Sequence, residues 1–151
     1  MKRFAMFAAL GVVVLFGVIQ LVPYRVTNPP VQQEPSWNSP RTRQLAVAAC
    51  FDCHSNETIT YWWEDVAPLS WWITKHVDDG RSALNFSECR QRGGGESGDA
   101  AETVTNGSMP PGYYHWFGLH SSANLTAAEK RDLASGLRAT LRGWSCGHGG
   151  G

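Results

Sequence analysis

The sequence predicts an all-α fold, a small helical domain preceded by one N-terminal transmembrane helix. Three observations support this prediction. The chain begins with an uncharged, mostly apolar run over residues 4–22. Helix-start signals recur along the rest of the chain, and the last of them opens a stripe of leucines spaced four residues apart. Finally, the 151 residues have room for one domain and a small segment at one end.

The apolar run over residues 4–22 follows Lys2 and Arg3. At a rise of about 1.5 Å per residue, it nearly matches the thickness of a bilayer core. The positive start predicts a cytoplasmic N-terminus and a remainder on the other side of the membrane. A cleaved signal peptide is the alternative, but its apolar region is usually shorter and ends in small residues, whereas this run continues to Pro23. We therefore expect residues 1–24 to form a retained single-pass anchor.

Residues 25–39 form the next segment, which includes Pro29, Pro30 and Pro35 and shows little periodicity. Such a composition is typical of an extended tether between a membrane and a domain. The domain itself is expected to span residues 40–151.

Two helices are expected in the first half of this domain. Ser39 and Pro40 have the form of an N-cap followed by proline at the first helical position, which predicts a helix that ends at Ala49. A second helix is predicted over residues 69–79, where it follows a proline and precedes Gly80, its expected stop.

In the second half of the domain, the sequence predicts a short helix over residues 99–105 and a longer one near the C-terminus. Thr126 and Glu129 have the spacing of a capping box, which opens a helix that continues to about residue 141. Its apolar stripe for the core consists of Leu133, Leu137 and Leu141.

Directly after the helix that ends at Ala49 comes a C-x-x-C-H run, in which His54 follows Cys50 and Cys53. This spacing is typical of covalent attachment of c-type haem. Two thiols one helical turn apart can each form a thioether with a haem vinyl group, and the histidine is an axial ligand for the iron. A redox dithiol or half of a zinc site is the alternative for the two cysteines alone.

Met109 is the candidate for the second axial ligand. It lies between turn residues and the prolines Pro110 and Pro111, which resist helix formation and could present the thioether rigidly. A lone methionine in a loop usually fills a gap in the packing. The haem motif upstream favours the ligand role, because His/Met pairs are known in cytochromes.

Other histidines are weaker candidates. His76 could share a helical face with apolar residues, where a histidine is more often packed than bound to a metal. His115 or His120 could complete a zinc site with Cys50 and Cys53, but they lack a recognisable second-half spacing. His148, in the glycine-rich C-terminal tail, is a weak ligand candidate.

The charge balance excludes several classes of function. Thirteen basic and thirteen acidic residues cancel, so there is no electrostatic case for binding nucleic acid or for wholesale adhesion to a membrane surface. No nucleophile and base arrangement, phosphate loop or pair of catalytic carboxylates stands out in the sequence. We therefore expect no substrate turnover by protein groups; the haem would supply the chemistry.

Together these residues resemble the bacterial haem-binding domain family, small C-x-x-C-H proteins that often follow a membrane helix. The resemblance implies an all-helical, cytochrome c-like domain with Cys50 and Cys53 as attachment points, His54 as proximal ligand and Met109 as distal ligand. In bacteria it implies an anchor in the inner membrane and a periplasmic domain. The matching stretches are residues 22–24, 28–31, 49–58, 67–71, 76–77, 80–81, 84–87, 109–111 and 113.

The chain departs from the family pattern at Cys89, where an aromatic residue is usual, and in a glycine-rich loop after Arg92. Cys89 and Cys146 are two further thiols in a compartment that permits disulfides, and the sequence leaves open whether they pair. Arg81 could neutralise a haem propionate, since a guanidinium suits carboxylates, or it could be a surface charge after Gly80.

Three functions are consistent with these residues. The first is a membrane-anchored c-type cytochrome that binds one covalent haem and transfers electrons to an unidentified redox partner. The second is a haem-based sensor or peroxidase-like protein, which requires an open or displaceable sixth ligand in place of Met109. The third is a non-haem protein in which Cys50 and Cys53 form a dithiol or a zinc site.

Overall fold

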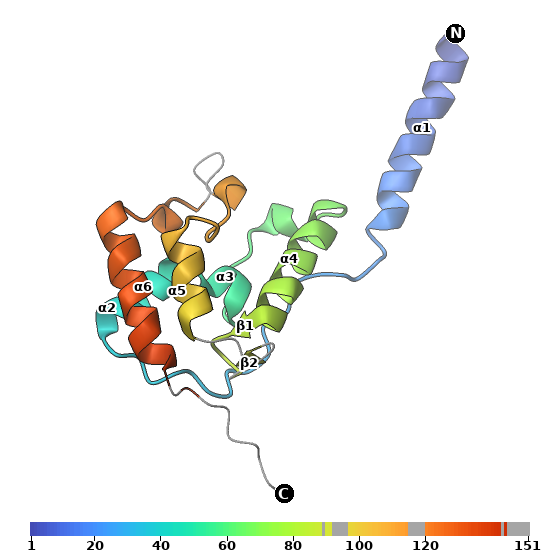
Figure 1. Cartoon of the computed structure of the whole chain (residues 1–151). Helices are drawn as coiled ribbons and strands as arrows, with labels where there is room; N and C mark the ends of the chain where they lie inside the picture. Colours follow the sequence, from blue (N-terminus) through green and yellow to red (C-terminus); the bar gives the residue numbers. More distant parts are fainter. Residues whose placement is uncertain (89, 92–96, 115–119, 143, 145–151) are drawn as a thin grey trace, which may run out of the picture.

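A computed structural model describes residues 1–88, 90–91, 97–114, 120–142 and 144. One long helix, α1, projects from a body built of shorter helices (Figure 1). The chain is mostly helical, which confirms the all-α prediction and the N-terminal apolar helix. The two further thiols, Cys89 and Cys146, and the candidate ligands His115 and His148 lie outside the described residues.

Helix α1 (Lys2–Ile19) has no buried residue, and its mean hydropathy over 18 residues is 2.0. By length and composition it could cross a membrane, and a signal sequence would meet the same test. The helix ends earlier than the predicted run, because the chain turns after Gln20. Its exposed apolar surface is much larger than soluble proteins usually tolerate, so a lipid environment suits it.

Helices α2 (Pro40–Ala49) and α6 (Ala127–Leu141) begin where the sequence predicts. The Ser39 hydroxyl accepts a hydrogen bond from the backbone N–H of Thr42 at 3.1 Å. Thr126 and Glu129 form the predicted capping box, each side chain accepting from the other residue's backbone N–H. Both signals act over three residues, so local sequence suffices to set these two helix starts.

The core lies between α2, α5 (Ser97–Thr105) and α6. At Gly136 of α6 an added Cβ would collide with the Thr42 side chain, so the glycine lets α2 and α6 pack closely. The large buried side chains of this core include the three predicted leucines. They are Leu45, Phe51, Phe86, Leu125, Leu133, Leu137 and Leu141.

On the other side of the body, the short α3 (Phe51–His54) packs against α4 (Leu69–Ala83). The prediction that Gly80 ends α4 is wrong, because the helix continues to Ala83 and is capped at Leu84. An added Cβ at Gly80 would collide with the carbonyl oxygen of Cys53. The glycine is therefore needed for the close approach of α3, not for a helix stop.

Four short elements complete the described body. Strands β1 (Leu84–Asn85) and β2 (Arg90–Gln91) pair antiparallel, with Leu84 opposite Gln91. The 3-10 turns η1 (Trp62–Asp65) and η4 (Ser121–Ala123) precede α4 and α6.

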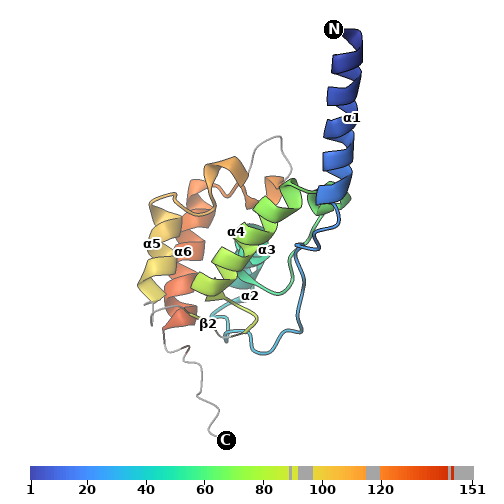
Figure 2. The same cartoon turned by 90° about the vertical axis from the view of Figure 1, so that its right-hand side faces the viewer.

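Residues 25–39, the segment predicted to be a tether, lie along the body (Figure 2). The Asn28 side chain donates to the carbonyl of Thr58 at 2.8 Å and accepts from the Thr58 N–H at 3.1 Å. Further along, the backbone N–H groups of Gln32 and Gln33 both donate to the carbonyl of Ser87. These hydrogen bonds attach the segment to the loop that follows α3 and to the region after β1.

Candidate haem site

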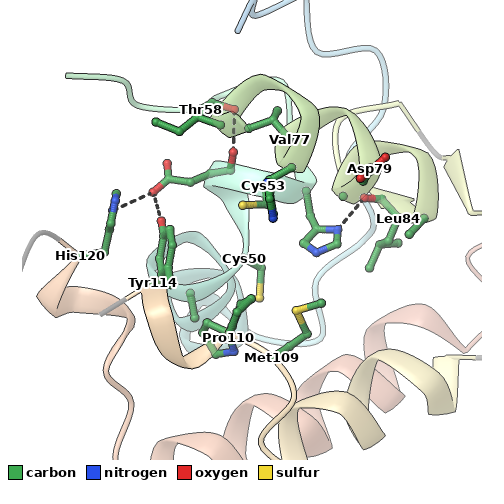
Figure 3. Close-up of a pocket in the computed structure, with 18 of the residues that line it drawn as sticks. Cys50, Cys53, Thr58, Val77, Asp79, Leu84, Met109, Pro110, Tyr114 and His120 are labelled. Carbon is green, nitrogen blue, oxygen red and sulfur yellow. Dashed lines mark hydrogen bonds and ion pairs between the residues drawn. The ribbon is translucent and has the colours of Figure 1, made fainter. Parts of the chain in front are cut away.

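A pocket of about 990 Å³ opens beside α3 (Figure 3). It is lined by residues of α4, of α5 and the segment that follows it, and of α6. This volume lies at the upper end of the range for small-molecule and cofactor sites. Its wall is mostly apolar, and four of the predicted site residues belong to it. They are Cys50, Cys53, His54 and Met109.

Cys50 and Cys53 stand one helical turn apart at the junction of α2 and α3. The carbonyl of Cys50 accepts hydrogen bonds from the N–H groups of Cys53 at 3.2 Å and His54 at 2.9 Å. Both cysteines are free thiols. Burial raises the pKa of Cys50 to about 12 and that of Cys53 to about 11, so both stay neutral at neutral pH. The pocket thus contains two reduced sulfur atoms in the spacing that thioether attachment requires.

His54 is oriented by its backbone and by its ring. Nδ1 lies 3.0 Å from the carbonyl oxygen of Leu84, and the His54 carbonyl accepts from the N–H of Phe86 at 2.8 Å. Burial lowers the pKa of His54, which favours the neutral imidazole. Because a carbonyl can only accept, Nδ1 of the neutral ring carries the proton and Nε2 keeps a lone pair. This carbonyl partner is the arrangement usual for a histidine that binds a metal through Nε2.

Met109 lies in the loop after α5, and its backbone N–H donates to the carbonyl of Thr103 at 3.0 Å. Pro110 and Pro111 follow it, and all three residues line the pocket. The side chain of Met109 is 39% exposed. The structure therefore brings the methionine to the cavity that contains Cys50 and His54, from a position far along the chain.

Arg81 follows the pocket residue Gly80 and binds protein oxygen atoms. Its guanidinium group donates to the carbonyls of Ser55 and Thr27, both at 2.7 Å. It also donates to the Asn28 side chain at 3.0 Å and to the Thr58 hydroxyl at 2.9 Å. These contacts fix the loop after His54 to the segment at residues 27–28. A propionate contact for Arg81 stays a prediction that these hydrogen bonds do not favour.

A polar cluster that the sequence does not predict occupies one side of the pocket. The Tyr114 hydroxyl donates to the Asp52 carboxylate at 2.5 Å, and Nδ1 of His120 lies 3.7 Å from the same oxygen. The rings of Tyr114 and His120 stack at 4.0 Å. Burial raises the pKa of Tyr114 and that of the neighbouring pocket residue Glu64, which favours their neutral forms. Asp52 lies within the C-x-x-C-H motif, but nothing in the sequence indicates its distant partners.

His76 also lines the pocket, on the face of α4 that the sequence predicts. Its Nδ1 lies 2.7 Å from the carbonyl of Trp72, and its ring packs against Trp72 and Tyr113. For the zinc hypothesis, the described part of the chain contains no group of three or more His, Cys, Asp and Glu side chains placed to bind a metal.

The donor set and the cavity fit a haem. Cys50 and Cys53 supply neutral thiols, His54 supplies an imidazole with a free Nε2, and Met109 supplies a thioether. The apolar wall would exclude water from a porphyrin, as haem pockets require.

Comparison with known proteins agrees with this fit. The family model described as "Haem-binding domain" matches residues 14–139, which is most of the chain. No curated protein and no solved structure matches the chain. Because the family model spans the C-x-x-C-H motif, the pocket and most of α6, the chain belongs to the haem-binding domain family.

Proposed function

We propose that the protein is a membrane-anchored c-type cytochrome that binds one covalent haem and transfers electrons outside the cytoplasm. The observation that carries this proposal is the orientation of His54 in a pocket that also contains both thiols of the motif. When bound, the haem iron supplies one-electron redox chemistry.

The residues of the chain would divide the work as follows. Cys50 and Cys53 attach the group, and His54 binds the iron through Nε2, with the Leu84 carbonyl fixing its ring. Met109 would be the second protein ligand, and a His/Met pair would favour outer-sphere electron exchange and a raised reduction potential. The apolar wall excludes water and keeps the iron from side reactions.

The anchoring part of the proposal rests on α1. Its 18 residues, which are mostly apolar and of which none is buried, and the positive charges of Lys2 and Arg3 at its start fit a retained single span with the domain on the outer side. Alkaline extraction of bacterial membranes tests retention, and protease added to spheroplasts tests the side. A full-length protein that stays in the membrane pellet and is digested from outside supports the proposal; release as a shorter, soluble chain contradicts the anchor.

The haem assignment is tested by producing the full chain with a cytochrome c maturation system and then denaturing it. Haem that stays bound to the unfolded chain, with a low-spin reduced spectrum before unfolding, is expected. The weak methionine-to-iron band of the folded protein should disappear in Met109→Ala. A colourless protein would contradict the proposal.

A second candidate function is a haem sensor or peroxidase-like protein. The observation in its favour is the exposed fraction of Met109, 39%, on a loop rather than on a helix. A ligand in such a position can be displaced more easily than a buried one. Immediate binding of carbon monoxide by the wild-type reduced protein favours this function, whereas binding only after Met109→Ala favours electron transfer.

A further inference from the structure

The end of α1 is bonded to the body of the protein. The side-chain amide of Gln20 donates to the carbonyl of Ala67 at 3.0 Å and accepts from the N–H of Ala67 at 2.9 Å. Beyond the end of the helix, the Tyr24 hydroxyl donates to the carboxylate of Asp78 at 2.8 Å. The first residue after the helix is therefore paired with Ala67, a buried residue just before α4. The end of α1 accordingly lies beside the start of α4 (Figures 1 and 2).

The same end of the body has a concentration of exposed, large apolar side chains. Trp62 is 81% exposed, although its neighbour Trp63 lines the pocket. We name this surface the apical patch; its members are Ile59, Tyr61, Trp62, Leu69, Trp72 and Tyr113. Most of them come from η1, from the residues before it and from the first turn of α4, the region to which Gln20 is bonded.

The position of the patch relates it to the bilayer surface. The headgroup zone on each side of a bilayer is about 5–7 Å thick, half the difference between the total and the hydrocarbon thickness. Ala67 pairs with the residue that directly follows α1, so the patch residues near it lie at the level of this zone when α1 spans the membrane. Tryptophan and tyrosine are the side chains that favour this zone, because their rings are apolar and their polar atoms reach water.

We propose that the apical patch rests in the lipid headgroup region beside α1. Four of its members, Ile59, Leu69, Trp72 and Tyr113, are exposed and also line the pocket, so they form part of its rim. This part of the rim then lies at the membrane surface, while the interior of the pocket stays available to the haem. The proposal rests on the proposed function only in that α1 is retained in the bilayer. We propose lipid and not a second protein as the partner. Because the end of α1 is hydrogen-bonded to Ala67, a bilayer spanned by α1 lies directly beside the patch.

The test uses the full-length holoprotein in vesicles of phosphatidylethanolamine and phosphatidylglycerol. A photoreactive benzoylphenylalanine replaces Trp62 in one variant and Leu10 of the anchor in another. A third variant replaces Val47, which is 43% exposed on α2 and serves as the matched control on the body. Lipid adducts after irradiation are measured by mass spectrometry of the intact chain.

Lipid adducts at positions 10 and 62, with none at 47, are expected. Adducts at 10 without adducts at 62 overturn the proposal and leave the anchor intact. A lack of adducts at both positions overturns the proposal together with the anchor. Cross-linking of position 62 to a second protein copy in place of lipid also overturns it, since the patch is then a protein interface.

A further substitution, combined with the photoreactive residue at position 62 or 10, tests the connection through Gln20. Gln20→Leu keeps the apolar character at the end of α1 but removes both hydrogen bonds to Ala67. The yield of lipid adducts at position 62 should fall several-fold, while the yield at position 10 stays unchanged. An unchanged yield at position 62 would show that the hydrogen bonds of Gln20 do not hold the patch at the membrane. It would overturn the argument that these bonds place the patch there.

Discussion

The two sides of the body use apolar residues in opposite ways. Between α2, α5 and α6, leucines fill the space so closely that Leu133 is 0% exposed and Gly136 has no room for a Cβ beside Thr42. Around the pocket, residues of similar character surround an open volume, and Trp72 remains 49% exposed. The core between α2, α5 and α6 is filled by the chain's own side chains, and we call it the complete side. The pocket side, the incomplete side, leaves a volume that an additional apolar group would fill. Apolar side chains that surround an unfilled volume thus indicate a ligand site as clearly as polar ones do.

The largest expected effect is on the incomplete side, from replacing both cysteines that we propose attach the haem. Cys50→Ser with Cys53→Ser removes both sulfur atoms and should abolish covalent haem. After denaturation, haem should separate completely from the chain, as measured by haem staining of a denaturing gel. Cys50→Ser alone should leave a single attachment. Haem that still stays with the denatured double variant would contradict the assignment.

A pair of truncations, Leu133→Ala and Trp72→Ala, sharpens the comparison. Leu133→Ala opens a cavity in the complete side and should cost about 2–5 kcal/mol of unfolding free energy with or without haem. Trp72→Ala should cost little without haem, because half of this side chain faces solvent, and more once haem is bound. Urea unfolding of both forms measures the difference. Equal losses for Trp72→Ala in both forms would remove the distinction between the two sides.

Gly80, on the pocket side, and Gly136, in the core, allow the two sides to be compared at close helix contacts. Gly80→Ala places a Cβ against the backbone carbonyl of Cys53, which cannot rotate away, and overpacking of this kind costs about 1–3 kcal/mol. It should also shift the haem absorption spectrum, since α3 has to move.

At Gly136, the neighbour is the side chain of Thr42. Gly136→Ala should destabilise the protein by a similar amount without a spectral shift, and Thr42→Ala in the same chain should recover part of the loss. An unshifted spectrum in Gly80→Ala would show that α3 does not depend on this contact.

The smallest expected effect concerns the ion pair of Glu34 and Arg43, at 2.7 Å, away from the pocket. The hydrogen bond from Arg43 lowers the pKa of Glu34 below its ordinary value of 4.5. The pair therefore stabilises the fold above pH 4.5 and loses this contribution as the pH falls through the lowered pKa.

Glu34→Gln should remove about 0.2–1 kcal/mol at pH 7, the usual range for an exposed pair. Its stability should approach that of wild type near pH 2, where both chains lack the charge. Denaturant unfolding at the two pH values measures the change; an equal loss at both would assign the effect to packing.

The elements that the sequence predicts correctly are those set by neighbouring residues. The Ser39 cap and the Thr126–Glu129 capping box both act within one helical turn, and both form as expected. Gly80 misled the prediction, because the same residue type serves a helix stop and a close helix contact. Only the position of α3 in space distinguishes the two roles.

The candidate site divides in the same way. The positions of Cys50, Cys53 and His54 follow from one short motif. Met109 follows from the two prolines after it and from the haem motif upstream, and the structure places it on the same pocket. The bond between Asp52 and Tyr114 joins residues 62 positions apart and depends on the tertiary fold. No spacing rule covers such pairs, so the polar side of the pocket required the structure.

The hydrogen bonds of Gln20, Tyr24 and Asn28 change how far the domain can travel. As a free coil, the predicted tether over residues 25–39 would give a reach of about 20 Å from the anchor. Within this segment, Asn28 bonds to Thr58 in the loop after α3, and the carbonyl of Thr27 accepts from Arg81 of α4, so the segment has little slack to extend. When α1 lies in a membrane, the domain cannot swing toward a distant partner. If the protein transfers electrons as proposed, a partner would then have to reach the domain by diffusing along the membrane, so the collision rate would depend on lipid fluidity and partner density.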